Sequence, residues 1–324
     1  MSQCRPFEVH GWLRNAHLQT IAGTFLRRKF LLPEGEERLF RVDAETQLKG
    51  ICHWQSGNRR DTPVIVIVHG LEGSSDSNYV RGIADKAWAR GFHTVRMNQR
   101  NCGGTERLTP TLYNSGLSAD YRAVLLELIA EGFEQIYFAG YSMGGNLVLK
   151  CAGEWGASAP PEFRGVAAVC PAADLAPSAD ALHDPPNRLY EAYFMWQLRR
   201  TFRNKARLFP KAFDLSRLQG LKTIRDFDDK VTAYYSGFAG AADYYARASA
   251  SNVIDRIAVP TLWVHAANDP FIRILPDTRR KIAANPRFTF IETADGGHCS
   301  FLGERNGYDG HWAEKQVVEF LGKL

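Results

Sequence analysis

The stretch QIYFAGYSMGGNLVLK, Gln135 to Lys150, decides how the rest of the chain is interpreted. Its apolar first third predicts a buried strand, and its last third has helical character. Between them, Gly140, Ser142 and Gly144 match G-x-S-x-G, the pattern that exposes a serine on a sharp turn from a strand into a helix. Ser142 is therefore the candidate nucleophile. The alternative is a glycine-rich turn whose serine has no chemical role.

Short apolar runs alternate with longer segments of helical periodicity along most of the chain. We expect strands at Val64 to Val68, Phe92 to Met97, Gln135 to Ala139, Phe163 to Cys170, Thr261 to His265 and Phe288 to Thr293. Helices are expected between Tyr79 and Trp88, between Leu117 and Ile129, after Leu147, and from Trp312 to Leu321. The alternation predicts an α/β fold with a mostly parallel central sheet and helices on both faces. Arg38 to Trp54 predicts a hairpin at the start of the sheet.

Residues 171 to 255 break this alternation, because they are rich in Tyr, Phe, Trp and Arg and contain no clear strand. We expect a helical cap insertion there, carried by a core of residues 1 to 170 and 256 to 324. Tyr190, Phe194 and Trp196, with Tyr141 beside the candidate nucleophile, are candidates for the lining of an apolar substrate pocket. The alternative is that these rings only pack the cap onto the core.

A serine hydroxyl becomes an effective nucleophile when a base takes its proton and a third group orients that base. His298 lies in the glycine-rich loop ADGGHCS after the last expected strand, and a neutral imidazole suits the role of base. Asp269 follows the preceding strand and is the expected orienting acid. Asp174, after the strand Phe163 to Cys170, is the rival position.

The oxyanion that forms during acyl transfer needs hydrogen-bond donors. We expect one to be the amide of Met143, directly after the nucleophile. The other is expected to be the amide of Leu71, in the loop HGLEGSS after the first parallel strand. The alternative is an ordinary glycine-rich turn. A phosphate-binding loop is disfavoured, because no Gly-Lys-Ser/Thr follows.

The composition argues against several classes of protein. The chain has 324 residues, of which 45% are hydrophobic, and a formal charge of +5 without a Lys/Arg block of the kind that binds nucleic acid. The cysteines are Cys4, Cys52, Cys102, Cys151, Cys170 and Cys299. They show no zinc-ligand spacing, so we expect no metal and no cofactor. The sequence shows neither a secretory leader nor an apolar run long enough to cross a bilayer, which favours a cytoplasmic protein.

A basic stretch runs from Arg199 to Lys211 without an acidic residue. One interpretation is a solvated helix face. The other is peripheral contact with an anionic membrane surface, or with an acidic substrate. The sequence leaves the oligomeric state open.

These motifs resemble the α/β-hydrolase superfamily, and more closely its YheT-like branch, which includes the embryogenesis-associated-protein-like hydrolases. The matching segments extend along nearly the whole chain: HLQTI at His17 to Ile21, HGLEGSSDSNYVRG at His69 to Gly82, NQRNCGG at Asn98 to Gly104, GYSMGGN, FDDKVTA at Phe227 to Ala233, NDPFI at Asn268 to Ile272 and GGHCSF at Gly296 to Phe301. The resemblance implies the α/β-hydrolase fold and a triad of Ser142, Asp269 and His298, in the chain order typical of the superfamily. The chain departs from the family at Asn101, where glycine is usual, although asparagine tolerates left-handed backbone angles.

Together, the residues and the resemblance predict a serine carboxylester hydrolase. It would act on small-molecule esters with short to medium acyl chains through an acyl-enzyme intermediate. One alternative is an acyltransferase that passes the same acyl group to an alcohol. Another is a hydrolase fold that binds a ligand without catalysis. Labelling of Ser142 by a fluorophosphonate would distinguish this last alternative from the other two.

Overall fold

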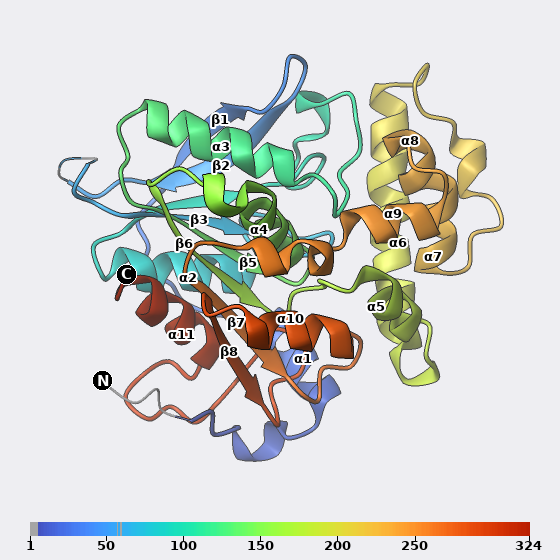
Figure 1. Cartoon of the computed structure of the whole chain (residues 1–324). Coiled ribbons are helices and arrows are strands. Elements are labelled where there is room, and N and C mark those ends of the chain that lie inside the picture. Colours follow the sequence, from blue (N-terminus) through green and yellow to red (C-terminus); the bar gives the residue numbers. More distant parts are fainter. Residues whose placement is uncertain (1–5, 57, 59) are drawn as a thin grey trace.

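The structure is a computed structural model in which residues 6–56, 58 and 60–324 are described. Its centre is an eight-stranded sheet with the order β1-β2-β4-β3-β5-β6-β7-β8 (Figure 1). The strands are β1 (Glu36–Arg41), β2 (Gln47–His53), β3 (Val64–Val68), β4 (His93–Met97), β5 (Ile136–Tyr141), β6 (Phe163–Val169), β7 (Thr261–Ala266) and β8 (Phe288–Thr293). β1 and β2 form the expected hairpin, and β2 is antiparallel to β4. The strands from β4 to β8 in this order are parallel, so the predicted sheet is confirmed.

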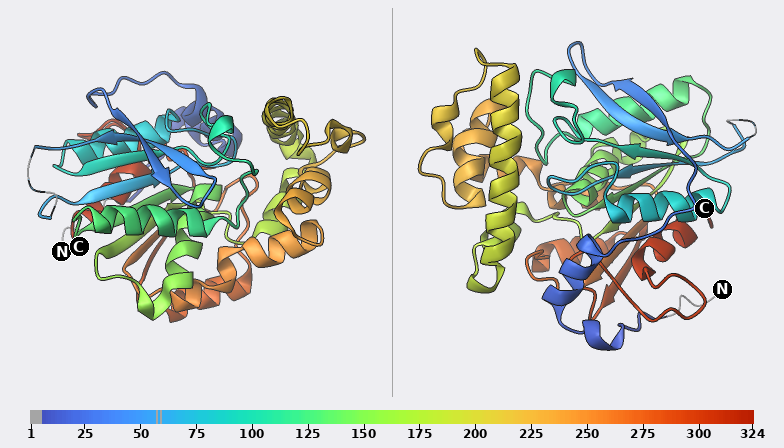
Figure 2. Two further views of the ribbon diagram at one scale, coloured as in Figure 1. Left: turned by 90° about the horizontal axis from the view of Figure 1, so that it is seen from above. Right: turned by 180° about the vertical axis from the view of Figure 1, so that it is seen from behind.

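Helices cover both faces of this sheet (Figure 2). α3 (Ser118–Ala130) and α4 (Met143–Trp155) pack on one face, and α2 (Asn78–Trp88) and α11 (Trp312–Leu321) pack on the other. α1 (Ala16–Phe25) precedes the sheet, and α10 (Pro276–Ala284) connects β7 to β8. All residues of β3 and β5 are buried, which explains why these strands are apolar without the alternation of a half-exposed strand.

The side chains of β5 alternate between the two cores. Ile136 and Phe138 belong to the core under α3 and α4. Tyr137, Ala139 and Tyr141 belong to the core under α2 and α11. This period of two therefore directs the ring of Tyr141 toward α2 and α11, away from the face that carries α4.

Between β6 and β7, the described chain forms helices and no strand. They are α5 (Leu175–Leu182), α6 (Arg188–Leu208), α7 (Ile224–Phe227), α8 (Tyr234–Ser236) and α9 (Ala241–Ala248). Figure 1 shows α6 to α9 grouped beside the sheet. A π-helical segment, Asp228–Ala233, joins α7 to α8. Such segments are frequent at functional sites, and this one includes part of the FDDKVTA motif.

Even the longest described helix, the 21-residue α6, does not combine the length and apolarity needed to span a bilayer, and neither does any other helix in the described part of the chain.

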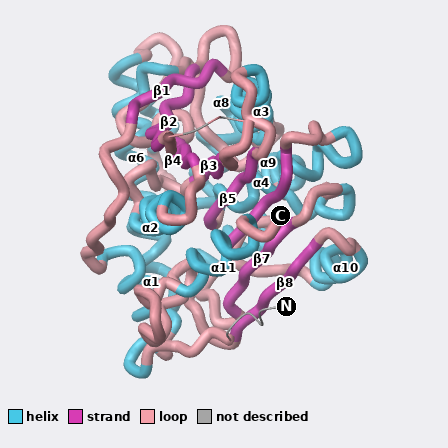
Figure 3. The backbone as a smooth tube through the Cα atoms, turned by 90° about the vertical axis from the view of Figure 1, so that its left-hand side faces the viewer, coloured by secondary structure: helices cyan, strands magenta, loops and turns pink. Residues whose placement is uncertain are grey.

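The loops that follow β5, β7 and β8 carry the three candidate catalytic side chains. Because these strands are parallel, their carboxyl ends lie at one edge of the sheet. Figure 3 shows β7 and β8 side by side. Open α/β sheets bind ligands at this edge. The topology therefore brings together Ser142, Asp269 and His298, which are far apart in the sequence.

Candidate active site

Ser142 occupies the turn between β5 and α4 with φ 52° and ψ −119°, a backbone conformation that is rare for L-residues. A Cβ atom at Gly140 would lie 2.3 Å from the carbonyl oxygen of Gly144, and one at Gly144 would lie 2.4 Å from that of Val68. Both glycines are thus required by close backbone approach. This is the strand–turn–helix context that the G-x-S-x-G motif needs in order to present its serine.

His298 and Asp269 are in direct contact. The Nδ1 atom of His298 lies 2.8 Å from Oδ2 of Asp269. The other carboxylate oxygen accepts hydrogen bonds from the amides of Phe271 and Ile272 at 3.1 and 2.9 Å. Since the carboxylate accepts from Nδ1, the lone pair of the neutral imidazole is left on Nε2, as a general base requires.

The contact also shifts the pKa of both groups. Burial by itself raises the pKa of Asp269 and lowers that of His298, because each charged form loses solvation. The attraction between the two charges and their hydrogen bond outweigh burial, so the pKa of Asp269 is lowered and that of His298 is raised. Asp269 is therefore an anion at neutral pH, and His298 is a stronger base than a free imidazole.

Ser142 and His298 line the same cavity, although no hydrogen bond between their side chains is present among the described contacts. The imidazole contacts Asp269 and, at 3.5 Å from Nε2, the sulfur of Cys299. Catalytic hydrogen bonds are often loose without substrate and tighten in the complex. The shared cavity is the observation that pairs the serine with the base.

Asp174, the rival acid, has different partners. Its carboxylate accepts hydrogen bonds from the Leu275 amide and the Thr278 hydroxyl, both at 2.9 Å. It thereby holds the first turn of α10 in place. The structure brings Asp269 to the imidazole and uses Asp174 to fix the loop that follows.

The loop after β3 is shaped by a buried histidine. Nδ1 of His69 lies 2.7 Å from the carbonyl oxygen of Gly70, and Nε2 accepts a hydrogen bond of 3.1 Å from the Gln99 amide. Burial lowers the pKa of His69 to about 4, so the ring is neutral and donates from Nδ1. This side chain fixes the backbone just before Leu71.

Leu71 and Met143 both line a cavity that contains Ser142. The neighbouring amides of Gly70 and Glu72 donate to tyrosine hydroxyls at 2.8 and 3.3 Å. Among the described residues, no acceptor takes a hydrogen bond from the Leu71 or Met143 amide. Both amides are therefore free to hold an oxyanion.

The sequence interpretation gave no role to two residues that position the site. His69 opens the HGLEGSS loop, and its place directly before Gly70 was the available signal. Thr20, in α1, accepts a hydrogen bond of 2.8 Å from the His298 amide and donates one of 2.7 Å to the Ala16 carbonyl. Thr20 lies in the HLQTI segment, which the family resemblance had singled out without a function.

A mostly apolar cavity extends from Ser142 toward the helices between β6 and β7. Its apolar wall includes Leu71, Met143, Leu175, Phe194, Leu198 and Phe271. Two acidic side chains, Glu72 and Asp228, also face it. Burial raises the pKa of both carboxyls, that of Asp228 to about 6. The cavity is thus apolar near the serine and has two carboxyl groups in its wall.

A second cavity meets the first at Ser142 and is more polar. Its wall includes Thr20, Arg28, Ser77, Tyr190, His298, His311 and Glu314. Arg28 and Glu314 form a two-point ion pair in it, at 2.5 and 2.8 Å. Phe194 lines both cavities and therefore lies between them.

Of the four residues expected to line the pocket, Phe194 and Tyr190 line a cavity, whereas Tyr141 and Trp196 do not. The Tyr141 ring stacks on Tyr79 at a centroid distance of 4.4 Å, because the alternation along β5 turns it to the opposite core. Trp196 is 54% exposed on the outer side of α6. The expectation for these two residues is corrected accordingly.

The basic stretch from Arg199 to Lys211 is not uniformly solvated. Arg203 and Arg207 are exposed, but Lys205 is fully buried. The Lys205 ammonium donates to the backbone carbonyl oxygens of Glu106 and Thr109. At Asn101, the departure from the family, φ is 64°, so asparagine adopts the left-handed conformation that glycine usually supplies.

Comparisons with known proteins agree with this geometry. The family model for the alpha/beta hydrolase fold matches residues 63–304. YheT of Escherichia coli is 31% identical over 316 residues, which cover 95% of this chain and 90% of that protein. The medium-chain fatty acid ethyl ester synthase/esterase 2 of Saccharomyces cerevisiae is 29% identical, with 98% and 75% of the two chains covered. The solved esterase Pf2001 of Pyrococcus furiosus has the same fold, with a TM-score of 0.57 and 15% identity over 90% of this chain and 92% of that one.

The family model covers most of the chain, and the match to YheT covers nearly all of it. Among the relatives are proteins named as an esterase, a monoacylglycerol lipase and a phospholipase. This chain therefore belongs to the α/β-hydrolase family, in its YheT-like branch, and is a carboxylic ester hydrolase.

Proposed function

We propose that the enzyme cleaves esters with Ser142 as nucleophile, His298 as general base and Asp269 as orienting acid. Ser142 Oγ attacks the ester carbonyl carbon while Nε2 of His298 takes its proton, and the amides of Leu71 and Met143 bind the oxyanion. The alcohol leaves with that proton, and water then hydrolyses the acyl-serine. The observation that carries this proposal is the 2.8 Å contact between His298 and Asp269, beside a strained Ser142 in one cavity.

The two cavities suggest how the substrate lies. The acyl chain occupies the apolar cavity, and the alcohol part occupies the more polar one, so that the ester carbonyl is at Ser142 where they meet. In this proposal, residues 171–255 act as a cap on the core formed by residues 1–170 and 256–324. Short to medium acyl chains fit an acyl cavity whose far wall is made by cap helices.

Acyl transfer is the second candidate, because a relative is named both synthase and esterase. The acyl-serine would be the same, and an alcohol in the polar cavity would replace water as the acceptor. Hydrolysis and acyl transfer differ only in whether water or an alcohol attacks the acyl-enzyme, and in both cases His298 is the base. A product analysis with added ethanol would separate ethyl ester from free acid.

The test of the triad combines covalent labelling with Ser142→Ala. The wild-type enzyme should react with a fluorophosphonate at Ser142 and lose hydrolysis of p-nitrophenyl esters. Ser142→Ala should lose at least about 1,000-fold in kcat/KM. Its unfolding midpoint should stay close to wild type, because the turn depends on its glycines rather than on the hydroxyl. Ser158→Ala, an exposed serine beyond the far end of α4, is the control. An active Ser142→Ala enzyme would overturn the proposal.

A further inference from the structure

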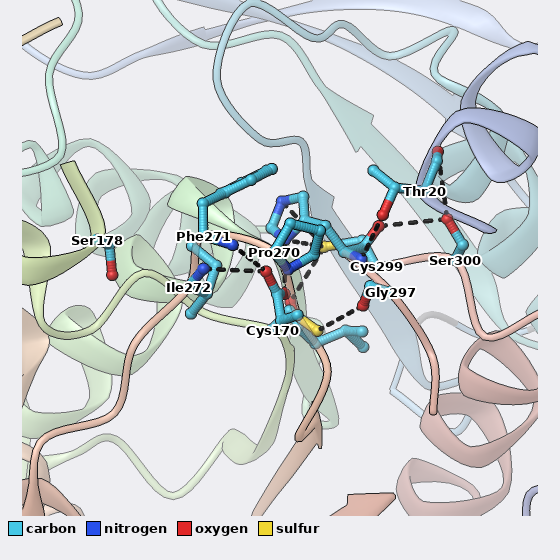
Figure 4. Close-up of polar contacts among 12 residues, drawn as sticks. Thr20, Cys170, Ser178, Pro270, Phe271, Ile272, Gly297, Cys299 and Ser300 are labelled. Atoms are coloured by element: carbon cyan, nitrogen blue, oxygen red, sulfur yellow. Dashed lines mark hydrogen bonds and ion pairs between the residues drawn. The ribbon is translucent and has the colours of Figure 1, made fainter. Parts of the chain in front are cut away.

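Two cysteines lie beside the imidazole of His298. Cys170 directly follows β6, and Cys299 follows His298 in the loop after β8. One ligand atom of each of the three side chains lies within 4.8 Å of the other two. The Cys299 sulfur is 3.5 Å from His298 Nε2. Figure 4 shows Cys170 and Cys299 within the polar contacts around Gly297.

We propose that Cys170, Cys299 and His298 form an inhibitory binding site for a thiophilic divalent cation, with Zn²⁺ as the expected ion. Zinc binds thiolate sulfur at about 2.3 Å and imidazole nitrogen at about 2.0–2.1 Å, so tetrahedral geometry places N and S ligands about 3.5 Å apart. The observed separation of Nε2 and the Cys299 sulfur is 3.5 Å. Two sulfurs and one imidazole are also a donor set that favours zinc over magnesium or calcium.

The imidazole is already held as a zinc ligand would be. Asp269 accepts from Nδ1 of His298, which leaves the lone pair on Nε2. The Cys299 sulfur lies beside the ring, 3.5 Å from Nε2 and 3.8 Å from Nδ1, so a side-chain rotation of Cys299 brings it to a metal held on Nε2. A carboxylate behind a histidine is the usual outer support of a metal-bound imidazole. The contact that orients a catalytic base therefore also prepares a metal ligand.

The backbone around the sulfurs is strained. Cys170 has φ 42° and Cys299 has φ 65°, although neither is glycine. The sulfurs interact with each other, and their contacts to backbone carbonyls are long, at 3.9 Å from Cys170 to Gly297 and at 3.7 Å from Cys299 to Val169. Strained residues of this kind cluster at functional sites, and a metal ion would replace the weak thiol contacts with stronger bonds to sulfur.

An ion can approach from the polar cavity, because both His298 and Cys299 line it. Cys170 is fully buried and supplies the inner ligand. Binding of one Zn²⁺ releases the two thiol protons to solvent and gives a complex with no net charge. It also occupies Nε2, so the base no longer accepts the proton of Ser142. The inhibition rests on the proposed triad, whereas the binding does not.

The inhibition test titrates Zn²⁺ against ester hydrolysis, with a phosphine reductant keeping the thiols reduced. Wild-type activity should fall and should return when EDTA is added. Cys170→Ala and Cys299→Ser should each raise the half-inhibitory Zn²⁺ concentration at least about 100-fold, measured against the metal-free rate of the same variant. Cys52→Ala, a buried cysteine on β2, is the matched control and should respond as wild type does. Equal sensitivity in all variants, or inhibition that EDTA does not reverse, would overturn the site.

Direct binding is measured with Co²⁺ in the Ser142→Ala enzyme, which needs no activity. Sulfur-to-cobalt charge-transfer bands should appear, and they should vanish when Cys170→Ala or Cys299→Ser is added. Absence of these bands would remove the metal site and leave the triad standing. If the cobalt bands appear but the zinc-loaded wild-type enzyme keeps full activity, the inhibitory role is overturned. That result would also count against His298 as the base.

Discussion

For single residues, the partners of a buried carboxylate decide its role more than its burial does. Asp269 and Asp174 are both 5% exposed. Asp269 meets an imidazole, whereas Asp174 meets an amide and a hydroxyl at the start of α10. The first arrangement orients an imidazole, and the second fixes a loop.

Replacing each aspartate by asparagine should separate these roles. Asp269→Asn should lower kcat by about 10⁴-fold, because an amide in place of the carboxylate leaves His298 in the wrong tautomer or orientation. Asp174→Asn should lower kcat by less than about tenfold and should mainly reduce stability, because one hydrogen bond of its pair is lost. Steady-state kinetics together with urea unfolding measure both effects. The reverse pattern would assign the orienting role to Asp174.

The pH dependence should show the influence of Asp269 on His298. Activity requires the neutral imidazole, so kcat/KM should rise with pH along a limb above the ordinary histidine pKa of about 6.5, since the pKa of His298 is raised. Without the carboxylate, burial, which lowers this pKa, is the largest remaining influence, and only the weaker effect of Cys170 raises it. An NMR titration of His298 should therefore give a lower pKa in Asp269→Asn than in wild type. An equal pKa in both enzymes would contradict this account.

Among the elements, helix α6 carries two aromatic residues in different environments, one at the cavities and one on the surface. Phe194 lines both cavities, whereas Trp196 is 54% exposed. Residues two apart on a helix do not share a face. The aromatic stretch in the sequence thus contains one cavity residue and one surface residue, which form a matched pair for a test.

Phe194→Ala should shift the acyl-chain optimum toward longer chains, because it enlarges the space where the two cavities meet. In wild type, each methylene buried in the cavity should contribute about 0.8 kcal/mol, so each should raise kcat/KM about fourfold until the cavity is full. Trp196→Ala should leave the optimum unchanged. A series of p-nitrophenyl esters of rising acyl length measures this. The same shift in both variants, or in neither, would exclude Phe194 as a determinant of chain length.

The strands and the serine turn were predictable because their signals are local. β3 and β5 are apolar runs, and the close approach of Gly144 to the Val68 carbonyl explains why the motif needs glycine. The direction of Tyr141 was also available, since the period of two along β5 places it on the face of Tyr137. The expectation for Tyr141 used proximity in sequence and overlooked this alternation.

The remaining parts of the site depend on contacts between distant segments. Thr20 holds the His298 loop across 278 positions. Cys170 and Cys299 meet only because β6 and β8 end at the same edge of the sheet. The spacing of cysteines along the chain could not predict this contact, because spacing patterns identify only metal ligands that are close in sequence.

In the whole molecule, polar side chains in the middle of α6 attach this helix to loops of the core. The Thr201 hydroxyl donates to Glu72 at 2.7 Å, which ties α6 to the loop that carries the Leu71 amide. The Lys205 ammonium donates to the carbonyl of Glu106 at 2.7 Å and to that of Thr109. These contacts connect α6, which contributes to the wall of the apolar cavity, with the loops that follow β3 and β4.

Lys205→Met should show what this attachment contributes. The change keeps most of the side-chain volume but leaves the carbonyls of Glu106 and Thr109 without their donor, at a cost of about 1–3 kcal/mol for each one that stays unsatisfied. The free energy of unfolding in urea should therefore fall. Arg203→Met, on the exposed side of the same helix, should change it by less than about 0.5 kcal/mol. A Lys205→Met protein more stable than wild type would mean that burying the ammonium costs more than its hydrogen bonds return. In that case, packing of the apolar face of α6, rather than this polar anchor, would hold the helix on the core.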